Sequence, residues 1–287
     1  MSEGTVPNRS AAEHHEAAIA LAAQGRFAEA VREYLEAARL EPKESRTFYN
    51  LGIAYGELSQ WKPAIRAYKR AIQLDPQDWQ AHGNLGVDYV NSRQYGEAVK
   101  AFRTAAKLNP QEMAFFVSIG YNCGRLKRYS EAIDAYVHAL ELKPDFAVGW
   151  YNIALFHFHQ HHYREAALAA ERALVIDSDY DEPYVIIGMV RRESGDFEGA
   201  MMAFRRAADI NPNFVEAHAN LGEAHLRRHE IEASIRQLQW AIQLRPEEPW
   251  PHHILALAHW KQRRMVSAIA DWATAAYLYL RKSSSRT

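Results

Sequence analysis

Apolar residues recur along the chain at steps of three and four, stop at short polar stretches such as Gly25-Arg26, and then resume. This spacing places apolar side chains on one face of an α-helix. Ser10 and Glu13 have the spacing of a capping box, which indicates that the first helix begins near Ala11. The pattern therefore predicts short helices joined in pairs by turns, and an all-α fold.

Prolines show that the pattern repeats every 34 residues. They stand at positions 42, 76, 110, 144, 212 and 246, and Ser178 takes the one vacant place in this series. Phased on the prolines, the chain holds eight units, at 11–44, 45–78, 79–112, 113–146, 147–180, 181–214, 215–248 and 249–282. We expect residues 1–10 to be a disordered N-terminal segment and residues 283–287 to be a C-terminal tail.

Two columns of small residues run through all eight units. The first is Ala37, Ala71, Ala105, Ala139, Ala173, Ala207, Ala241 and Ala275, and the second is Ala30, Ala64, Ala98, Ala132, Ala166, Ala200, Ser234 and Ala268. Small side chains allow two helix backbones to approach closely, and large residues such as Leu51, Tyr55 and Tyr68 fill the space beside them. With the Leu-Gly pairs and the prolines, these columns resemble the tetratricopeptide repeat. The resemblance implies a right-handed superhelical solenoid of eight helix-turn-helix repeats, with the first helices lining a concave surface.

The sixth place of the first helix, which lies on the concave floor in this family, holds a row of asparagines at Asn50, Asn84, Asn152 and Asn220. Because asparagine carries both a donor and an acceptor, such a row can hydrogen-bond the backbone of an extended peptide. The row is similar to the asparagine ladder of the repeat domain of O-linked N-acetylglucosamine transferases. It is interrupted at Ser118 and Ile186, and asparagine is frequent at this place in tetratricopeptide repeats generally.

Neighbouring places on the expected concave surface are largely apolar, and few charged residues fall there in the first five repeats. An exposed apolar surface of this extent indicates a partner. The expected peptide-binding groove consists of Tyr49, Asn50, Ile53, Asn84, Val87, Tyr121, Tyr151, Asn152, Leu155, Phe158 and Asn220.

The last helix, expected from Met265 to Lys282, is too apolar for the polar cap that usually ends a repeat array. Trp272, Tyr277 and Tyr279 are the candidates for a contact with a second copy or another protein at this end face. Alternatively, these long side chains fold back onto the preceding helix and leave little apolar surface exposed.

Composition narrows the class of partner. The 34 Lys and Arg residues nearly balance 35 Asp and Glu residues, so no net field attracts the chain to nucleic acid or to anionic lipid. No apolar run is long enough to span a membrane, the first ten residues lack the apolar core of a signal peptide, and a single cysteine excludes an internal disulfide. We expect a cytoplasmic protein that neither binds nucleic acid nor inserts into a membrane.

Residues that could carry catalysis or bind a metal have simpler interpretations. Cys123 falls in a core column of the repeat, which favours a buried apolar role over a nucleophile. His157 and His161 are four residues apart, but His161 takes the place of Gly25 in the turn, so the two should not share a helical face. No phosphate-binding loop, nucleophile elbow or zinc-protease motif is present, and we expect no catalysis, no cofactor and no metal.

The sequence therefore predicts a non-catalytic scaffold or adaptor that holds a peptide or helix of a partner protein in its concave groove. Two alternatives stay open. One is a structural protein that assembles with itself through its end faces, and the other is a regulatory subunit of a separate enzyme such as a glycosyltransferase.

Overall fold

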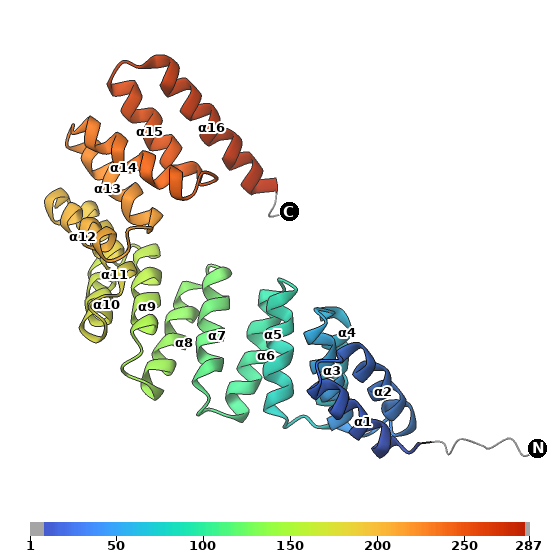
Figure 1. Ribbon diagram of the computed structural model, residues 1–287. Coiled ribbons are helices and arrows are strands. Elements are labelled where there is room, and N and C mark those ends of the chain that lie inside the picture. Colours follow the sequence, from blue (N-terminus) through green and yellow to red (C-terminus); the bar gives the residue numbers. More distant parts are fainter. Residues whose placement is uncertain (1–8, 285–287) are drawn as a thin grey trace, which may run out of the picture. The chain divides into compact units, whose positions relative to one another are not determined.

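The structure is a computed structural model that describes residues 9–284, and these residues form sixteen α-helices and no strand (Figure 1). The predicted all-α fold is confirmed. Residues 1–8 of the expected N-terminal segment and residues 285–287 of the expected tail lie outside the described part. The last helix continues to Ser284, two residues past the expected end of the array.

The chain divides into two compact units that meet in sequence between Pro144 and Asp145. Unit 1 contains α1 (Ala11–Ala23), α2 (Phe27–Leu40), α3 (Ser45–Glu57), α4 (Trp61–Leu74), α5 (Trp79–Asn91), α6 (Tyr95–Leu108), α7 (Met113–Arg125) and α8 (Tyr129–Leu142). Unit 2 contains α9 (Ala147–His159), α10 (Tyr163–Ile176), α11 (Asp181–Glu193), α12 (Phe197–Ile210), α13 (Val215–Arg227), α14 (Ile231–Leu244), α15 (Pro249–Lys261) and α16 (Met265–Ser284).

Each unit is a stack of helical hairpins. An odd-numbered helix packs against the even-numbered helix that follows it, and within a unit that second helix packs against the next hairpin. Because neighbouring odd-numbered helices such as α3 and α5 also contact each other, they build a shared surface on one side of the stack. The first helix begins as predicted, with both hydrogen bonds of the capping box between Ser10 and Glu13 in place.

The two small-residue columns lie in the core, as predicted, and every member is almost completely buried. Glycines in the first helices make room for large rings of the second helices. A Cβ atom on Gly86 would lie only 2.7 Å from the Phe102 ring, and one on Gly52 would lie 2.6 Å from Tyr68. The hairpins are therefore held together by close backbone approach, with one aromatic ring seated on each of these glycines.

Turns between the two helices of each hairpin all contain one residue with positive φ. Glycine supplies it at Gly25 and Gly195, whereas the other six hairpins use Ser59, Arg93, Lys127, His161, His229 and Arg263. Six hairpins end in an extended residue directly before a proline of the series, such as Glu41, at φ −124° and ψ 81°. The residue before a proline avoids the helical region, which fixes where the second helix stops.

Candidate functional site

Two adjoining pockets lie on the odd-helix surface of unit 1. The α3–α5 pocket has a volume of about 490 Å³ and is lined by Ile53, Gly56, Glu57, Ser59, Trp61, Tyr68, Asn84, Val87, Asp88 and Asn91. The α5–α7 pocket has a volume of about 240 Å³ and is lined by Tyr49, Trp79, Gln80, Gly83, Asn84, Val87, Phe102, Ala114, Phe115 and Ser118. Asn84 and Val87 belong to both pockets and form the ridge between them.

Contacts between side chains hold this ridge in place. Asn84 donates a hydrogen bond from Nδ2 to the Tyr49 hydroxyl over 3.2 Å. The Tyr49 ring meets the Tyr68 ring edge to face, with centroids 6.0 Å apart. Val87 is 48% exposed, which is high for a valine in the middle of a helix. The ridge therefore presents a fixed amide and an uncovered apolar side chain next to each other.

Asp88 follows Val87 in α5 and is only 5% exposed. Burial raises the pKa of its carboxyl group to about 6, from an ordinary value of 3.8. No described residue makes a hydrogen bond to its Oδ2 atom. With Glu57, it gives the α3–α5 pocket two carboxylates.

Asp88 is not among the groove residues expected from the sequence, although the sequence contains a signal for it. It occupies the tenth place of the first helix, which is apolar in six of the eight repeats and polar only at Asp88 and Asn122. Asn122 donates from Nδ2 to the Ser118 carbonyl oxygen, so part of its polar surface is satisfied within its own helix. Asp88 has no such donor within reach of Oδ2.

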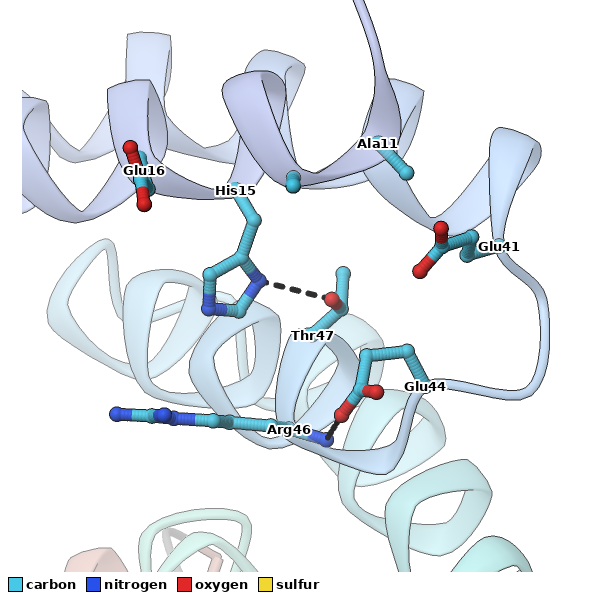
Figure 2. Close-up of a pocket in the computed structure, with 8 residues that line it drawn as sticks. Ala11, His15, Glu16, Glu41, Glu44, Arg46 and Thr47 are labelled. Atoms are coloured by element: carbon cyan, nitrogen blue, oxygen red, sulfur yellow. Dashed lines mark hydrogen bonds between the residues drawn. The ribbon is translucent and has the colours of Figure 1, made fainter.

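Asn50 contacts His15, a residue that lines a third pocket of unit 1, of about 270 Å³ (Figure 2). Its Nδ2 atom lies 3.4 Å from His15 Nε2, and His15 Nδ1 lies 2.8 Å from the hydroxyl of buried Thr47. Burial, and secondarily Arg46, lower the pKa of His15. A neutral ring protonated at Nδ1 satisfies both contacts, so His15 joins α1 to α3 at this end.

In unit 2, a pocket of about 350 Å³ lies on the odd-numbered helices and is lined by Tyr151, Leu155, Glu182, Val185, Ile186, Met189, Phe214, Glu216 and Asn220. Asn220 is buried, donates from Nδ2 to the Glu216 carbonyl oxygen, and accepts a hydrogen bond from Arg192. Asn152 likewise donates to a carbonyl oxygen of its own helix, that of Val148. Burial, with an added effect of neighbouring Asp181, raises the pKa of Glu182 to about 7.

The pockets bring together only part of the expected groove. Within unit 1 they include Tyr49, Ile53, Asn84 and Val87, and within unit 2 they include Tyr151, Leu155 and Asn220. The remaining expected residues, Asn50, Tyr121, Asn152 and Phe158, line none of these three pockets. Tyr121 is nevertheless exposed on α7, and the Phe158 ring packs against Tyr163.

At the end face, the three expected residues have different surroundings. Trp272 is half-buried and its ring lies 5.6 Å from the Trp260 ring. Tyr277 and Tyr279 are both exposed, whereas Leu278 between them is buried. Trp272 therefore contacts the preceding helix, as the alternative to an end-face contact expected, whereas Tyr277 and Tyr279 leave surface exposed.

The structure also shows the surroundings of Cys123, His157 and His161, the residues considered for catalysis and metal binding. Cys123 is fully buried, and burial raises the pKa of its thiol. His161 lies in a turn at φ 61° and His157 is half-buried in α9. In the part of the chain that the structure describes, no three His, Cys, Asp or Glu side chains are grouped as a metal site would require.

Within the same part, no helix combines the length and the apolar character needed to cross a membrane.

Sequence profiles of the tetratricopeptide repeat match residues 45–78, 79–112, 124–182 and 221–285, and a further profile described as TPR repeat matches 19–59 and 188–228. Together these matches cover most of the chain. The chain belongs to the tetratricopeptide repeat family.

Solved structures with the same fold support this assignment. YrrB, a TPR protein with an unusual peptide-binding site, is 18% identical with a TM-score of 0.57, over 64% of this chain and 95% of YrrB. MamA from Desulfovibrio magneticus RS-1 is 18% identical with a TM-score of 0.53, over 61% of this chain and 98% of MamA. A chain of the APC/C hetero-tetramer Cut9-Hcn1 is 15% identical with a TM-score of 0.64, over 88% of this chain and 50% of that one. No significant match was found among curated protein sequences.

Proposed function

We propose that this chain is a non-catalytic interaction scaffold, and that a peptide or helix of a partner protein binds along the odd-numbered helices of unit 1. The observation that carries the proposal is the pair of adjoining pockets that share Asn84 and Val87. They place an amide and exposed apolar side chains on one continuous surface, which is the combination that peptide-binding sites use.

The asparagine row enters this proposal mainly through Asn84. An amide offers two donors and two acceptor lone pairs, more than the single bond to Tyr49 uses, so Asn84 can also bond a ligand backbone. Asn152 and Asn220 already donate to carbonyl oxygens of their own helices. The likeness to the ladder of O-linked N-acetylglucosamine transferases is therefore proposed for unit 1, where Asn50 and Asn84 bond to other side chains.

Structural relatives are consistent with such a role. YrrB is described by its peptide-binding site, and Cut9 and Hcn1 form a hetero-tetramer. At this level of identity the likeness extends to the fold, and the pockets of unit 1 are the reason for carrying peptide binding over to this chain.

The test begins with selection of peptides from a random displayed library on the purified full chain, followed by calorimetry of the selected peptides. Combined substitution of Asn84→Ala and Val87→Gln should weaken binding about 10- to 100-fold, because it removes a buried hydrogen bond and apolar contact area. Val137→Gln, at a valine of α8 that is 42% exposed outside the pockets, is the matched control. Selected peptides that bind all variants equally would place the site elsewhere, and the absence of any selectable peptide would refute peptide binding.

Self-association is a second candidate function, because the apolar side chains of α16 are exposed along one side of the helix. Val266, Ile269, Tyr277 and Leu280 recur at steps of three, eight and three residues, and all four are exposed. These steps return to one face of an α-helix. We propose that this face, the α16 stripe, contacts a second copy of the chain.

A further inference from the structure

The Asp88 carboxylate is the buried polar group of unit 1 that the fold leaves least satisfied. Its side chain is almost completely buried, its Oδ2 atom has no hydrogen-bond partner among the described residues, and it lines the α3–α5 pocket. An unpaired carboxylate in such surroundings is costly, because burial removes water without supplying donors. No described residue donates a hydrogen bond to Oδ2 that would offset this cost.

The walls of the α3–α5 pocket supply apolar surface and negative charge, and no positive charge. Ile53, Trp61 and Tyr68 give it apolar and aromatic surface, and Glu57 adds a second carboxylate. No lysine, arginine or histidine is among the described residues that line it. Lys69, on the neighbouring helix α4, instead has its amino group over the Tyr89 ring, 5.7 Å from the centroid.

Because Gly56 has no side chain, it does not cover Asp88. A Cβ atom at Gly56 would meet only the Oδ1 atom of Asp88, at 3.7 Å, so the space beyond Gly56 leads directly to the carboxylate. Most repeats have a larger residue at the corresponding twelfth place of the first helix, namely Val90, Phe158, Arg192, Leu226 and Trp260. A side chain of that size at Gly56 would cover Asp88.

We infer that the α3–α5 pocket receives a lysine or arginine side chain of the bound peptide, with its cationic end donating a hydrogen bond to Oδ1 of Asp88, the oxygen on the Gly56 side. The aliphatic stem of the ligand side chain packs against Trp61 and Tyr68, as long basic side chains do on apolar surfaces. Glu57 adds a second negative charge to the pocket wall. The two carboxylates are too few for a metal site, whereas a partly aromatic pocket with negative charge fits a long cationic side chain.

This inference rests on the proposed function and names the ligand chemistry of the same site. The experiment selects peptides from the random displayed library on the full wild-type chain and, in parallel, on Asp88→Asn. Wild-type selections should converge on lysine or arginine at one position, and this preference should disappear on Asp88→Asn. Asparagine keeps the shape of aspartate, and Asp134→Asn, at an exposed carboxylate of α8, controls for the change in net charge.

Calorimetry on one selected peptide then measures the contact directly. Replacing its basic residue by norleucine should weaken binding to the wild type about 10- to 100-fold, because a charge-assisted hydrogen bond in a desolvated site is lost. The same replacement should change binding to Asp88→Asn only about two- to threefold, because the acceptor is already weakened. Gly56→Leu should abolish the basic preference without changing any charge.

The outcomes separate the two proposals. Peptides that bind the unit 1 groove without a basic preference, or whose basic residue contributes equally on Asp88→Asn, would overturn the inference and leave the peptide scaffold intact. An equal loss on Asp134→Asn would assign the preference to net charge and would also overturn it. If no peptide can be selected at all, the proposed peptide scaffold is refuted, and the inference about the basic side chain is refuted with it.

Discussion

At the scale of single residues, Asp88 connects binding to stability. Its pKa in the folded chain is raised by burial to about 6, above its ordinary value of 3.8. Between these two pH values the folded chain holds a proton that the unfolded chain has released. The free energy of unfolding therefore falls as pH rises through this window, and the loss is complete above it. Glu57 from α3 lines the same pocket as this carboxylate, and Lys69 from α4 has its amino group over the Tyr89 ring.

Asp88→Asn should therefore stabilise the free protein at pH 7.5, by about 1–3 kcal/mol, because the buried charge is removed. At pH 4 the same substitution should have almost no effect, since Asp88 is then protonated and neutral. Urea unfolding of the wild type and the variant at both pH values measures this difference. An equal gain at both pH values would show that the charge of Asp88 is not its cause.

Turn residues allow a second prediction at this scale. Arg93 has φ 59° in the turn between α5 and α6, a conformation that costs a residue with a Cβ atom about 1–2 kcal/mol. Arg93→Gly should raise the free energy of unfolding by about 0.5–1 kcal/mol, after the larger entropy of the unfolded glycine chain is deducted.

Lys100→Gly, in the interior of α6, is the matched control for Arg93→Gly. It should have the opposite effect and lower the free energy of unfolding by about 1 kcal/mol, because glycine in the interior of a helix has a lower helix propensity than lysine. Denaturant unfolding of both variants measures the two changes. If Arg93→Gly also lowers the free energy of unfolding, the positive φ of Arg93 is not a source of strain.

At the scale of helices and hairpins, close approach between a glycine and a ring governs stability. A Cβ atom at Gly86 would lie 2.7 Å from the Phe102 ring, in a fully packed interface of α5 with α6. Gly86→Ala should lower the free energy of unfolding by about 1–3 kcal/mol through overpacking. In the background of Phe102→Leu the same change should cost much less, because the ring that clashes is gone.

Gly96→Ala, which meets nothing within 4 Å in α6, is the matched control for Gly86→Ala. It should stabilise the protein by about 0.5–1 kcal/mol, because alanine is the better helix former. Thermal or urea unfolding of Gly86→Ala, Gly96→Ala, Phe102→Leu and the double variant of Gly86→Ala with Phe102→Leu measures these effects. If Gly86→Ala and Gly96→Ala change stability alike, the hairpin contact is looser than described.

The same scale explains what the sequence could predict. Helices and the buried columns follow from local periodicity, because every repeat places its small residues at the same steps, and the structure confirms both. Side-chain partners within the groove do not follow from it. Asn84 bonds Tyr49 across two helices, whereas Asn152 in the same column bonds Val148 in its own helix. A rotamer choice separates the two, and the repeat pattern contains no information about it.

Asp88 marks the other limit of prediction from the sequence. Its column is apolar in six of the eight repeats, which is typical of a core position, and the structure does bury the residue. Whether a polar member of a core column is satisfied depends on which groups face it from other helices. Only the three-dimensional arrangement shows that Gly56 leaves it accessible from a pocket while no donor reaches Oδ2.

At the scale of the whole molecule, the α16 stripe determines the proposed oligomeric state. Val266, Ile269, Tyr277 and Leu280 are all exposed, and among the described helices α16 packs mainly on α15. The stripe extends over about two heptads with the spacing that antiparallel or parallel helix pairs use as a seam. Trp272 and Tyr279 lie on other sides of α16, so of the three residues expected from the sequence only Tyr277 belongs to this stripe.

We expect the wild-type chain to dimerise through this stripe, with a melting temperature that rises with protein concentration. The double substitution Ile269→Glu and Tyr277→Glu should make the chain monomeric, because two carboxylates would be buried opposite each other in a symmetric contact. Leu168→Glu with Val175→Glu, at two exposed apolar residues of α10, is the matched control and should leave the dimer unchanged. Size-exclusion chromatography with light scattering over a wide concentration range distinguishes the variants. A wild-type chain that stays monomeric throughout, or a dimer that survives both glutamates on α16, would exclude the stripe as a contact between copies.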